Sequence, residues 1–332
     1  MPDNQGKEPE VLLKASKLTK DFVINRKQVV HAVSEIDLEI RRGETLALVG
    51  ESGCGKSTLG RTLIHLLKPT SGTVTFKGQE ITGLSDREFK PIRRKMQMVF
   101  QDPYASLDPR MTVRDIIAEP LVTYRVCATE EETTKRVLEL MEKVGVPGEF
   151  LLRYPHQFSG GQRQRIGIAR AIALDPELLV CDEPVSALDV SVQSQVLNLL
   201  KRLKAELDLT SLFIGHDLSV INFVADRVCV MFLGRMCEIA PKDVLYTKPL
   251  HPYTEFLLEA IPLADPHRRD ENRRILSGEI PSPVNPPSGC YFHTRCPYAT
   301  DLCRKEQPQM KDYGNGHQSA CHRCRELYAD RL

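Results

Sequence analysis

Apolar and polar residues alternate, or short apolar blocks recur, from Val11 to Phe76, as in ETLALVG. Strict alternation is typical of half-buried strands, and short unbroken apolar blocks are typical of fully buried strands. This block leads straight into ESGCGKST, and the residues after Ser57 have a helical spacing that we expect to end at Lys68-Pro69. The pattern therefore predicts a strand, a glycine-rich loop and a helix in succession.

The pattern then changes, because the stretch from about Ser85 to Leu174 is mostly helical and polar. Within it, TEEETTKRVLELMEKVGV predicts an amphipathic helix with a capping threonine. After it, ELLVCDEP predicts a buried strand, VSVQSQVLNLLKRLKAEL a helix and TSLFIGHD a second strand. Alternating helices and buried strands indicate a largely parallel sheet that is covered on both faces.

Beyond Pro262 the hydrophobic pattern fades. ADPHRRDENRR is strongly charged and GEIPSPVNPPSG is rich in proline, so we expect an extended connector. A small module rich in Cys and His follows it. No internal repeat is present.

Charge and hydropathy narrow the possible partners. The chain has 45 basic and 44 acidic side chains, so no global field draws it to nucleic acid or to an anionic membrane surface. No stretch approaches the roughly 18 to 20 apolar residues that span a bilayer, and the opening MPDNQGKEPE lacks a secretory apolar core. We therefore expect a cytosolic protein that reaches a membrane only through partners.

A glycine-rich loop at positions 50–57 carries the first candidate chemistry. It fits G-x-x-x-x-G-K-S, whose glycines let backbone N–H groups curl around phosphate oxygens at the start of a helix. In this interpretation Lys56 neutralises the β- and γ-phosphates and Ser57 binds Mg²⁺. An ordinary glycine turn is the alternative, and Cys54 is expected to be a small neutral filler. The predicted nucleotide-binding residues here are Gly50, Glu51, Ser52, Gly53, Cys54, Gly55, Lys56, Ser57 and Thr58.

Two adjacent carboxylates form the second signal. The apolar run from Leu178 to Cys181 ends in Asp182-Glu183, and a strand that delivers carboxylates at its C-terminal end puts them beside a phosphate loop. Asp182 can hold Mg²⁺ through water, and Glu183 can polarise the attacking water. Strand ends often carry acidic residues, so the pair alone does not exclude the alternative that the two carboxylates have no catalytic role.

A second glycine-rich helix start follows Phe158 and leads into RQRIGIARAIAL. If the loop at positions 50–57 binds the phosphates in its own subunit, this second helix start has no phosphate to bind within that subunit. We expect it to reach across a dimer to the γ-phosphate held by a partner, through its helix dipole and a serine hydroxyl. Its residues are Ser159, Gly160, Gly161 and Gln162.

With these motifs, the sequence from about Leu12 to Ile261 resembles the ATPase subunits of ATP-binding cassette (ABC) transporters, whose signature motif is similar to FSGGQ. The resemblance implies an α/β fold with a P-loop NTPase (RecA-like) core, an antiparallel β subdomain, a helical subdomain at about 100–174 and a small Cys-rich C-terminal extension. It implies an ATPase domain at 1–262 and the extension at 263–332. It also implies ATP as substrate, with Mg²⁺ held by Ser57, Gln101 and Asp182.

The resemblance assigns roles to four more residues. Gln101 in MVFQDPYASLDPR matches the loop glutamine that senses Mg²⁺ and water and touches the membrane subunits, and Asp189 belongs to a loop that communicates across the dimer. His216 in FIGHD matches the switch histidine that contacts the γ-phosphate and orients Glu183 and the water. Phe22 in LTKDF matches the aromatic residue that stacks on adenine, with a core phenylalanine as the alternative.

The tail resembles one branch of the family. HPYTEFLLEAIP and GEIPSPVNPPSGC are similar to the C-terminal extension of ATPase subunits from oligopeptide and dipeptide importers. That resemblance implies a heterodimer with a second ATPase subunit, two transmembrane permease subunits and an extracytoplasmic peptide-binding protein, at the cytoplasmic face of the membrane. Relatives that serve metal chelates or sugars could share these motifs. The rival classes are a soluble cassette ATPase acting on ribosomes or DNA, for which no basic face is evident, and a non-catalytic subunit, which the complete catalytic set disfavours.

Five of the ten cysteines fall between Cys290 and Cys324. In a reducing compartment such a group suggests a metal site rather than disulfides. Zinc prefers tight C-x-x-C pairs, and only Cys321 to Cys324 offers one. Some dipeptide-importer ATPases are similar at four of these positions and carry a [4Fe–4S] cluster, so the resemblance favours that cluster over zinc or free thiols. Its ligands would be Cys290, Cys296, Cys303 and Cys321, with Cys324 spare.

Overall fold

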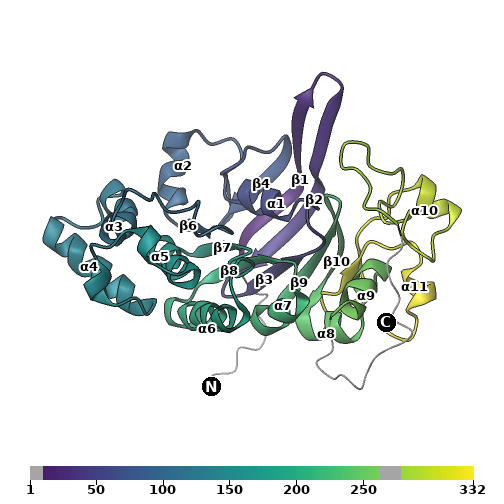
Figure 1. The fold of residues 1–332 in the computed structure, drawn as a ribbon. Coiled ribbons are helices and arrows are strands. Elements are labelled where there is room, and N and C mark those ends of the chain that lie inside the picture. The colour runs from purple at the N-terminus through teal and green to yellow at the C-terminus, as the bar shows by residue number, and fades with distance from the viewer. Residues whose placement is uncertain (1–9, 262–277) are drawn as a thin grey trace, which may run out of the picture. The chain divides into compact units, whose positions relative to one another are not determined.

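The computed structural model describes residues 10–261 and 278–332. The chain forms two compact units (Figure 1). Unit 1 contains the described residues up to Thr82 and those from Ile214 onward, and unit 2 is Gly83–Phe213. The two ends of the chain therefore build one unit, and its middle builds the other.

Unit 1 contains an antiparallel sheet with the strand order β2-β1-β4-β5. Its strands are β1 (Val11–Asn25), β2 (Gln28–Arg41), β4 (Ser71–Phe76) and β5 (Gln79–Glu80). β1 and β2 form the long hairpin that projects from unit 1 in Figure 1. Alternate side chains of this sheet are buried, as the sequence pattern predicted, and include Leu13, Ala15, Leu18, Ile36, Leu38 and Ile40. The expected antiparallel β part is confirmed.

A second set of strands in unit 1 runs in the order β11-β12-β10-β9-β3. β3 (Thr45–Val49) pairs in parallel with β9 (Arg227–Phe232), although the two strands lie far apart in the sequence. β10 (Arg235–Pro241) pairs antiparallel with β9 and with β12 (Gln318–Ser319), which pairs with β11 (Lys311–Asp312). The C-terminal residues thus extend the sheet that contains β3.

Unit 1 contains six helices within its described residues. They are α1 (Lys56–Leu63), α7 (Leu218–Val224), α8 (Lys242–Thr247), α9 (Pro252–Glu259), α10 (Asp301–Lys305) and α11 (Cys324–Leu327).

α1 is shorter than predicted, because it ends at Leu63 rather than at Lys68-Pro69. His65 lies in the left-handed region with φ 59°, and the amide of Leu66 donates to the carbonyl of Arg61. This is the bond pattern of a helix that closes with a left-handed residue. The leucines that follow continue the helical spacing of the sequence but not the helix.

Unit 2 has the strand order β8-β7-β6, and the chain leaves the unit within β8 (Thr210–Gly215). β7 (Leu178–Asp182) is buried throughout. Both β7 and β8 were predicted as strands from the sequence. β6 (Met96–Val99) pairs in parallel with β7 and corrects the prediction, which treated this stretch as helical. Four residues are too few for hydrophobic periodicity to separate a strand from a helix.

The helices of unit 2 begin at capping residues. α2 (Asp86–Arg93), α4 (Glu130–Lys143) and α5 (Gly160–Ile172) follow Ser85, Thr129 and Ser159, each of which accepts a backbone N–H at its helix start. α3 (Val113–Thr123) follows Thr112 in the same way, and α6 (Val190–Leu207) matches its predicted range. Single turns of 3-10 helix occur at Gly148–Phe150 and Pro155–Gln157.

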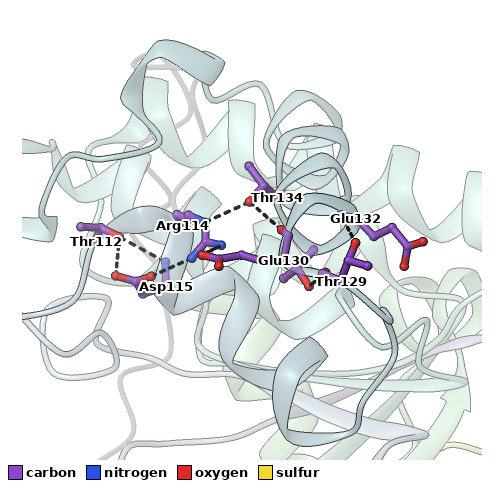
Figure 2. A network of polar contacts seen from close by, with 8 residues as sticks. Thr112, Arg114, Asp115, Thr129, Glu130, Glu132 and Thr134 are labelled. Carbon is purple, nitrogen blue, oxygen red and sulfur yellow. Dashed lines mark hydrogen bonds and ion pairs between the residues drawn. The ribbon is translucent and has the colours of Figure 1, made fainter.

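A polar network joins the starts of α3 and α4 (Figure 2). Arg114 donates from Nε to Thr134 Oγ1 at 3.1 Å and from Nη2 to Glu130 Oε1 at 2.9 Å. Thr112 donates to Asp115 Oδ2 at 2.7 Å, and this bond is the main reason that the pKa of Asp115 is lowered. The network ties two helix N-termini together through one guanidinium group.

The predicted charged connector ADPHRRDENRR lies outside the described residues. Among helices at residues 10–261 and 278–332, none combines the length and the hydropathy that crossing a bilayer requires.

Candidate functional site

The glycine loop follows β3 and ends at α1, as the sequence predicted. Gly50 has φ 153° and Gly55 has φ 98°. A Cβ atom at Gly50 would lie 2.1 Å from the carbonyl oxygen of Met231, and one at Gly55 would lie 2.0 Å from that of Ala32. Only glycine fits these positions. Gly55 is also the N-cap of α1 and offers no side-chain cap, so a phosphate can take that place at the helix start.

Lys56 lies inside this loop and is 4% exposed. Its Nζ donates to the carbonyl of Gly50 at 2.8 Å and to that of Glu51 at 2.9 Å. The Cys54 Sγ lies 3.8 Å from the same ammonium group. Burial raises the pKa of the Cys54 thiol, which keeps it uncharged near neutral pH. Ser57 and Thr58 are half-buried in the first turn of α1.

The paired carboxylates lie at the end of β7. Asp182 is fully buried, and Glu183 has φ 44°, a conformation that costs free energy for any residue other than glycine. Gln101 Nε2 donates to Glu183 Oε2 at 3.0 Å. The structure therefore brings together two of the predicted catalytic residues, although they are far apart in the sequence.

The second glycine-rich helix start forms a reciprocal cap at α5. Ser159 Oγ accepts from the Gln162 amide at 3.3 Å, and the Gln162 side chain accepts from the Ser159 amide at 3.0 Å. A Cβ atom at Gly161 would lie 2.3 Å from Val192 Cγ1, so this glycine permits close packing of α5 on α6. Ser159 itself is exposed, and Gly160 is half-buried. Asp189, the N-cap of α6, is exposed and makes no side-chain cap bond.

Two further predicted residues lie in unit 1. His216 is exposed and follows β8 directly, beside Asp217, the N-cap of α7. Phe22, on β1, is 38% exposed, so it is not the core residue that formed the alternative. Lys20 Nζ lies 5.0 Å from the centroid of the Phe22 ring.

Four cysteines of the C-terminal extension line one small cavity of about 20 Å³ together with His293 and His322. They are the predicted set Cys290, Cys296, Cys303 and Cys321. Burial raises the pKa of Cys290 to about 11 and that of Cys321 to about 12. Cys324, predicted as the spare thiol, lies outside this lining and packs against Leu250 and Tyr328.

In the part of the chain that the structure describes, no group of three or more His, Cys, Asp or Glu side chains is arranged to hold a metal ion. All ten cysteines are free thiols.

Sequence reasoning missed two residues that contact the glycine loop. Tyr253 on α9 accepts the Glu51 amide through its hydroxyl at 2.9 Å. Arg295 in the C-terminal extension pairs with the Glu51 carboxylate at 2.6 and 3.1 Å. No local pattern could have found them, because they lie 202 and 244 residues from Glu51.

A glycine loop with a buried lysine before a helix, and paired carboxylates at the end of a buried parallel strand, define a P-loop nucleoside triphosphatase. Residues 33–186 match the family model described as "ABC transporter", and residues 237–303 match the model described as "Oligopeptide/dipeptide transporter, C-terminal region".

Similar proteins span nearly the whole chain. It is 55% identical over 312 residues to a putative oligopeptide transport ATP-binding protein, YkfD, from Bacillus subtilis (strain 168), covering 94% of this chain and 95% of the relative. It is 54% identical to the oligopeptide transport ATP-binding protein AppF of the same organism, covering 88% and 89%. The chain therefore belongs to the ABC transporter family of ATPases, whose members hydrolyse ATP with Mg²⁺.

Solved structures agree with this fold. The dimeric post-hydrolysis state of the ATP-binding cassette MJ0796 bound to ADP and Pi has a TM-score of 0.64 at 33% identity, covering 70% of this chain and 99% of that chain. The protein cbiO1 from Clostridium perfringens, part of the ABC transporter complex cbiONQ, has a TM-score of 0.64 at 29% identity, covering 73% and 93%. The expected ABC cassette fold is thus confirmed.

Proposed function

We propose that this chain is the ATP-hydrolysing subunit of an importer that takes up dipeptides or oligopeptides, at the cytoplasmic face of the membrane. The observation that carries the catalytic part is the hydrogen bond between Gln101 and Glu183 at the end of β7. The peptide part is supported by the relatives named as oligopeptide transport ATP-binding proteins and by the matching C-terminal region. Import of another solute, a metal chelate or a sugar, is the second candidate.

In the proposed mechanism the loop amides and Lys56 bind the β- and γ-phosphates of ATP. Lys56 then exchanges its two carbonyl partners for phosphate oxygens. Glu183 polarises the attacking water, and His216 orients that water and the γ-phosphate. Phe22 stacks on the adenine, for which its half-exposed ring is suited.

We propose that three residues hold the Mg²⁺ ion that the family uses. Ser57, Gln101 and Asp182 offer oxygen ligands, the donor type that Mg²⁺ prefers. When bound, Mg²⁺ neutralises charge that develops on the phosphates. Gln101 has a second proposed role, which is to report this state to the membrane subunits.

Substitution of Glu183 by Gln tests the catalytic assignment. We expect ATP turnover to fall by about a hundredfold or more, because the amide of glutamine cannot accept a proton from water as the carboxylate does. ATP binding should persist. Glu177→Gln, at the other end of β7, is the matched control and should retain turnover, since Glu177 pairs with Lys95 at 2.5 Å. Parental turnover in Glu183→Gln would contradict the assignment.

We propose that Ser159, Gly160, Gly161 and Gln162 complete the nucleotide site of a partner ATPase subunit, with Asp189 beside them. Ser159 and Asp189 are exposed, so a second chain can reach them. A bulky Ser159→Arg variant should still bind ATP but lose turnover in the assembled transporter. Thr123→Arg, at an exposed position at the end of α3, is the control. Unchanged turnover of Ser159→Arg would exclude a shared site.

The assembly that we propose contains a second, paralogous ATPase subunit, two transmembrane permease subunits and an extracytoplasmic peptide-binding protein. Co-expression with candidate permeases, followed by purification in detergent, tests it. Peptide-loaded binding protein should stimulate ATP turnover, and stimulation by a metal chelate or a sugar instead would favour the second candidate.

We propose that Cys290, Cys296, Cys303 and Cys321 hold a [4Fe–4S] cluster. The four thiols line one cavity, which supports a common ligand. Each thiolate of such a cluster binds a different iron, so the ligand arrangement differs from the four ligands around a single zinc ion. The cluster would tie together a segment that has few helices or strands.

Anaerobic purification followed by iron and sulfide analysis tests the cluster. We expect four irons and four sulfides per chain, by the definition of the cluster. Cys303→Ser should lower both, whereas Cys324→Ser, outside the cavity, should not. One zinc per chain, or no metal, would contradict the proposal.

A further inference from the structure

Glu51 in the glycine loop is held through all of its polar groups. Its amide donates to the Tyr253 hydroxyl at 2.9 Å, and its carbonyl accepts from Lys56 Nζ at 2.9 Å. Its carboxylate accepts two parallel bonds from Arg295, at 2.6 and 3.1 Å. A two-pronged bond of this kind fixes both the position and the charge of the carboxylate.

Arg295 is itself held in a buried setting. Its side chain is 6% exposed, and its guanidinium carbon lies 6.0 Å from the centroid of the Phe232 ring. Phe292, three residues earlier, packs against the rings of Phe232 and Tyr253, each at 5.3 Å. This aromatic cluster anchors the segment that presents Arg295 to the loop.

We propose that Arg295 is a positioning residue for nucleotide binding, because it keeps the Glu51 carboxylate paired and away from Lys56. This inference rests on the proposed role of the loop as the phosphate site. The C-terminal extension thereby acts on the ATP site of its own chain.

Competition for Lys56 is the physical reason. The Lys56 ammonium lies 2.9 Å from the backbone carbonyl of Glu51, and we infer that a carboxylate released on the same residue can turn toward it. That carboxylate would also repel the phosphates, because like charges in a partly buried site interact strongly. With Arg295 in place, Glu51 contributes its backbone to the loop while its negative charge is neutralised.

The test measures ATP affinity of the full chain by calorimetry, with all variants checked for cooperative thermal unfolding. Arg295→Met keeps the apolar stem and removes the charge, and we expect about tenfold weaker binding of ATP. Adding Glu51→Gln to that variant should restore affinity to within about twofold of the parent, because the released charge is gone. Arg295→Lys keeps a positive charge and should weaken binding less than Arg295→Met.

Two controls separate this inference from its premises. Lys56→Ala must lose ATP binding, and if it does not, the proposed function of the loop fails rather than the role of Arg295. Arg331→Met breaks a comparable ion pair, to Glu255 at 3.0 Å, in the same extension without touching the loop, and it should bind ATP normally.

Three results would overturn the proposal. They are parental affinity in Arg295→Met, failure of Glu51→Gln to restore affinity, and an equal loss in Arg331→Met. If Arg295→Met does not fold, Arg295→Lys with and without Glu51→Gln gives the same comparison.

Discussion

The motif G-x-x-x-x-G-K-S prescribes no residue type at the position of Glu51, yet all the polar groups of Glu51 have defined partners in the structure. The motif requires only that the backbone at this position points its groups correctly, and any residue can satisfy that. Here the side chain adds a connection to Arg295 in a distant part of the same unit. A variable position in a common loop can therefore connect that loop to a segment specific to one branch of the family.

Gly50 carries the steric requirement of the loop. Gly50→Ala would place a Cβ atom 2.1 Å from the Met231 carbonyl oxygen, a distance at which the backbone must move. We expect destabilisation of about 2 kcal/mol or more and loss of ATP binding. Gly83→Ala is the control for bulk, because Gly83 does not have a positive φ and a Cβ atom there meets nothing within 4 Å. Chemical denaturation of both variants measures the difference, and equal stability would contradict the argument.

Cys54 lies in the same loop, and its reactivity follows from its burial. Burial raises the pKa of this thiol above its usual value of 9.0, so the reactive thiolate forms only at a higher pH than in an exposed cysteine. We expect iodoacetamide to label Cys54 at pH 7.5 far more slowly than the half-buried Cys127, and labelling to rise once the protein unfolds. Peptide mass spectrometry after timed labelling checks this. Labelling of Cys54 as fast as that of Cys127 would show that the loop opens in solution.

At the scale of elements, the helix starts are where sequence and structure agree most clearly. Thr129 was predicted as a cap, and its hydroxyl accepts the Glu132 amide at 3.1 Å at the start of α4. A local bond of this kind depends only on residues three positions apart. Such a cap can therefore be predicted from the sequence.

Thr129→Ala should lower the free energy of unfolding by about 1 kcal/mol, because one helix-end N–H loses its partner. The change should leave ATP binding intact, since Thr129 contacts no predicted site residue in its own network (Figure 2). Thr123→Ala, exposed at the end of α3, should change stability by less than about 0.5 kcal/mol. Urea titration of the two variants separates the cap from a general effect of losing threonine.

The elements show how far the sequence could predict the fold. β7 and α6 were predicted within a residue or two, because a fully buried strand and a long amphipathic helix each have a distinctive period. The sequence predicted a longer α1, because the helical spacing of apolar residues continues past His65, whose left-handed backbone ends the helix. β6 was missed because it is short.

The candidate site divides in the same way. Residues of the glycine loop and of the α5 start were predicted from motifs, because each motif is a short run of consecutive residues. The role of Gln101 required the resemblance, whereas its bond to Glu183 and the pairing of Arg295 with Glu51 required the structure. Contacts between distant segments depend on the fold, which no short pattern encodes.

At the scale of the whole molecule, the C-terminal extension belongs to unit 1. β12 pairs with β10, and His317 Nε2 lies 2.7 Å from the carboxylate of Glu238, which is fully buried. The extension thus covers a strand edge and a buried charge of the unit that contains the glycine loop. Losing the extension would leave the edge of β10 unpaired and would remove the His317 partner of Glu238, which would keep only its bond from the Leu250 amide.

A chain that stops after Ile261 should therefore lose stability in unit 1 but not in unit 2. We expect faster hydrogen exchange in β9, β10 and the glycine loop, and unchanged exchange in α3 and α4, because unit 2 lacks residues from the extension. Glu238→Gln in the shortened chain should recover part of the protection. Uniform loss of protection in both units would contradict the division.

Because unit 1 contains residues from both ends of the chain, the two units cannot be completed at the same time during translation. Gly83–Phe213 is complete once its last residue leaves the ribosome, so unit 2 can fold while translation continues. β3 must wait for β9, its parallel neighbour, and the apolar strands made first are the last to be covered. A nascent chain paused just after residue 213 has left the ribosome should therefore expose its earliest segments to chaperones and proteases, although the helices made later are already protected.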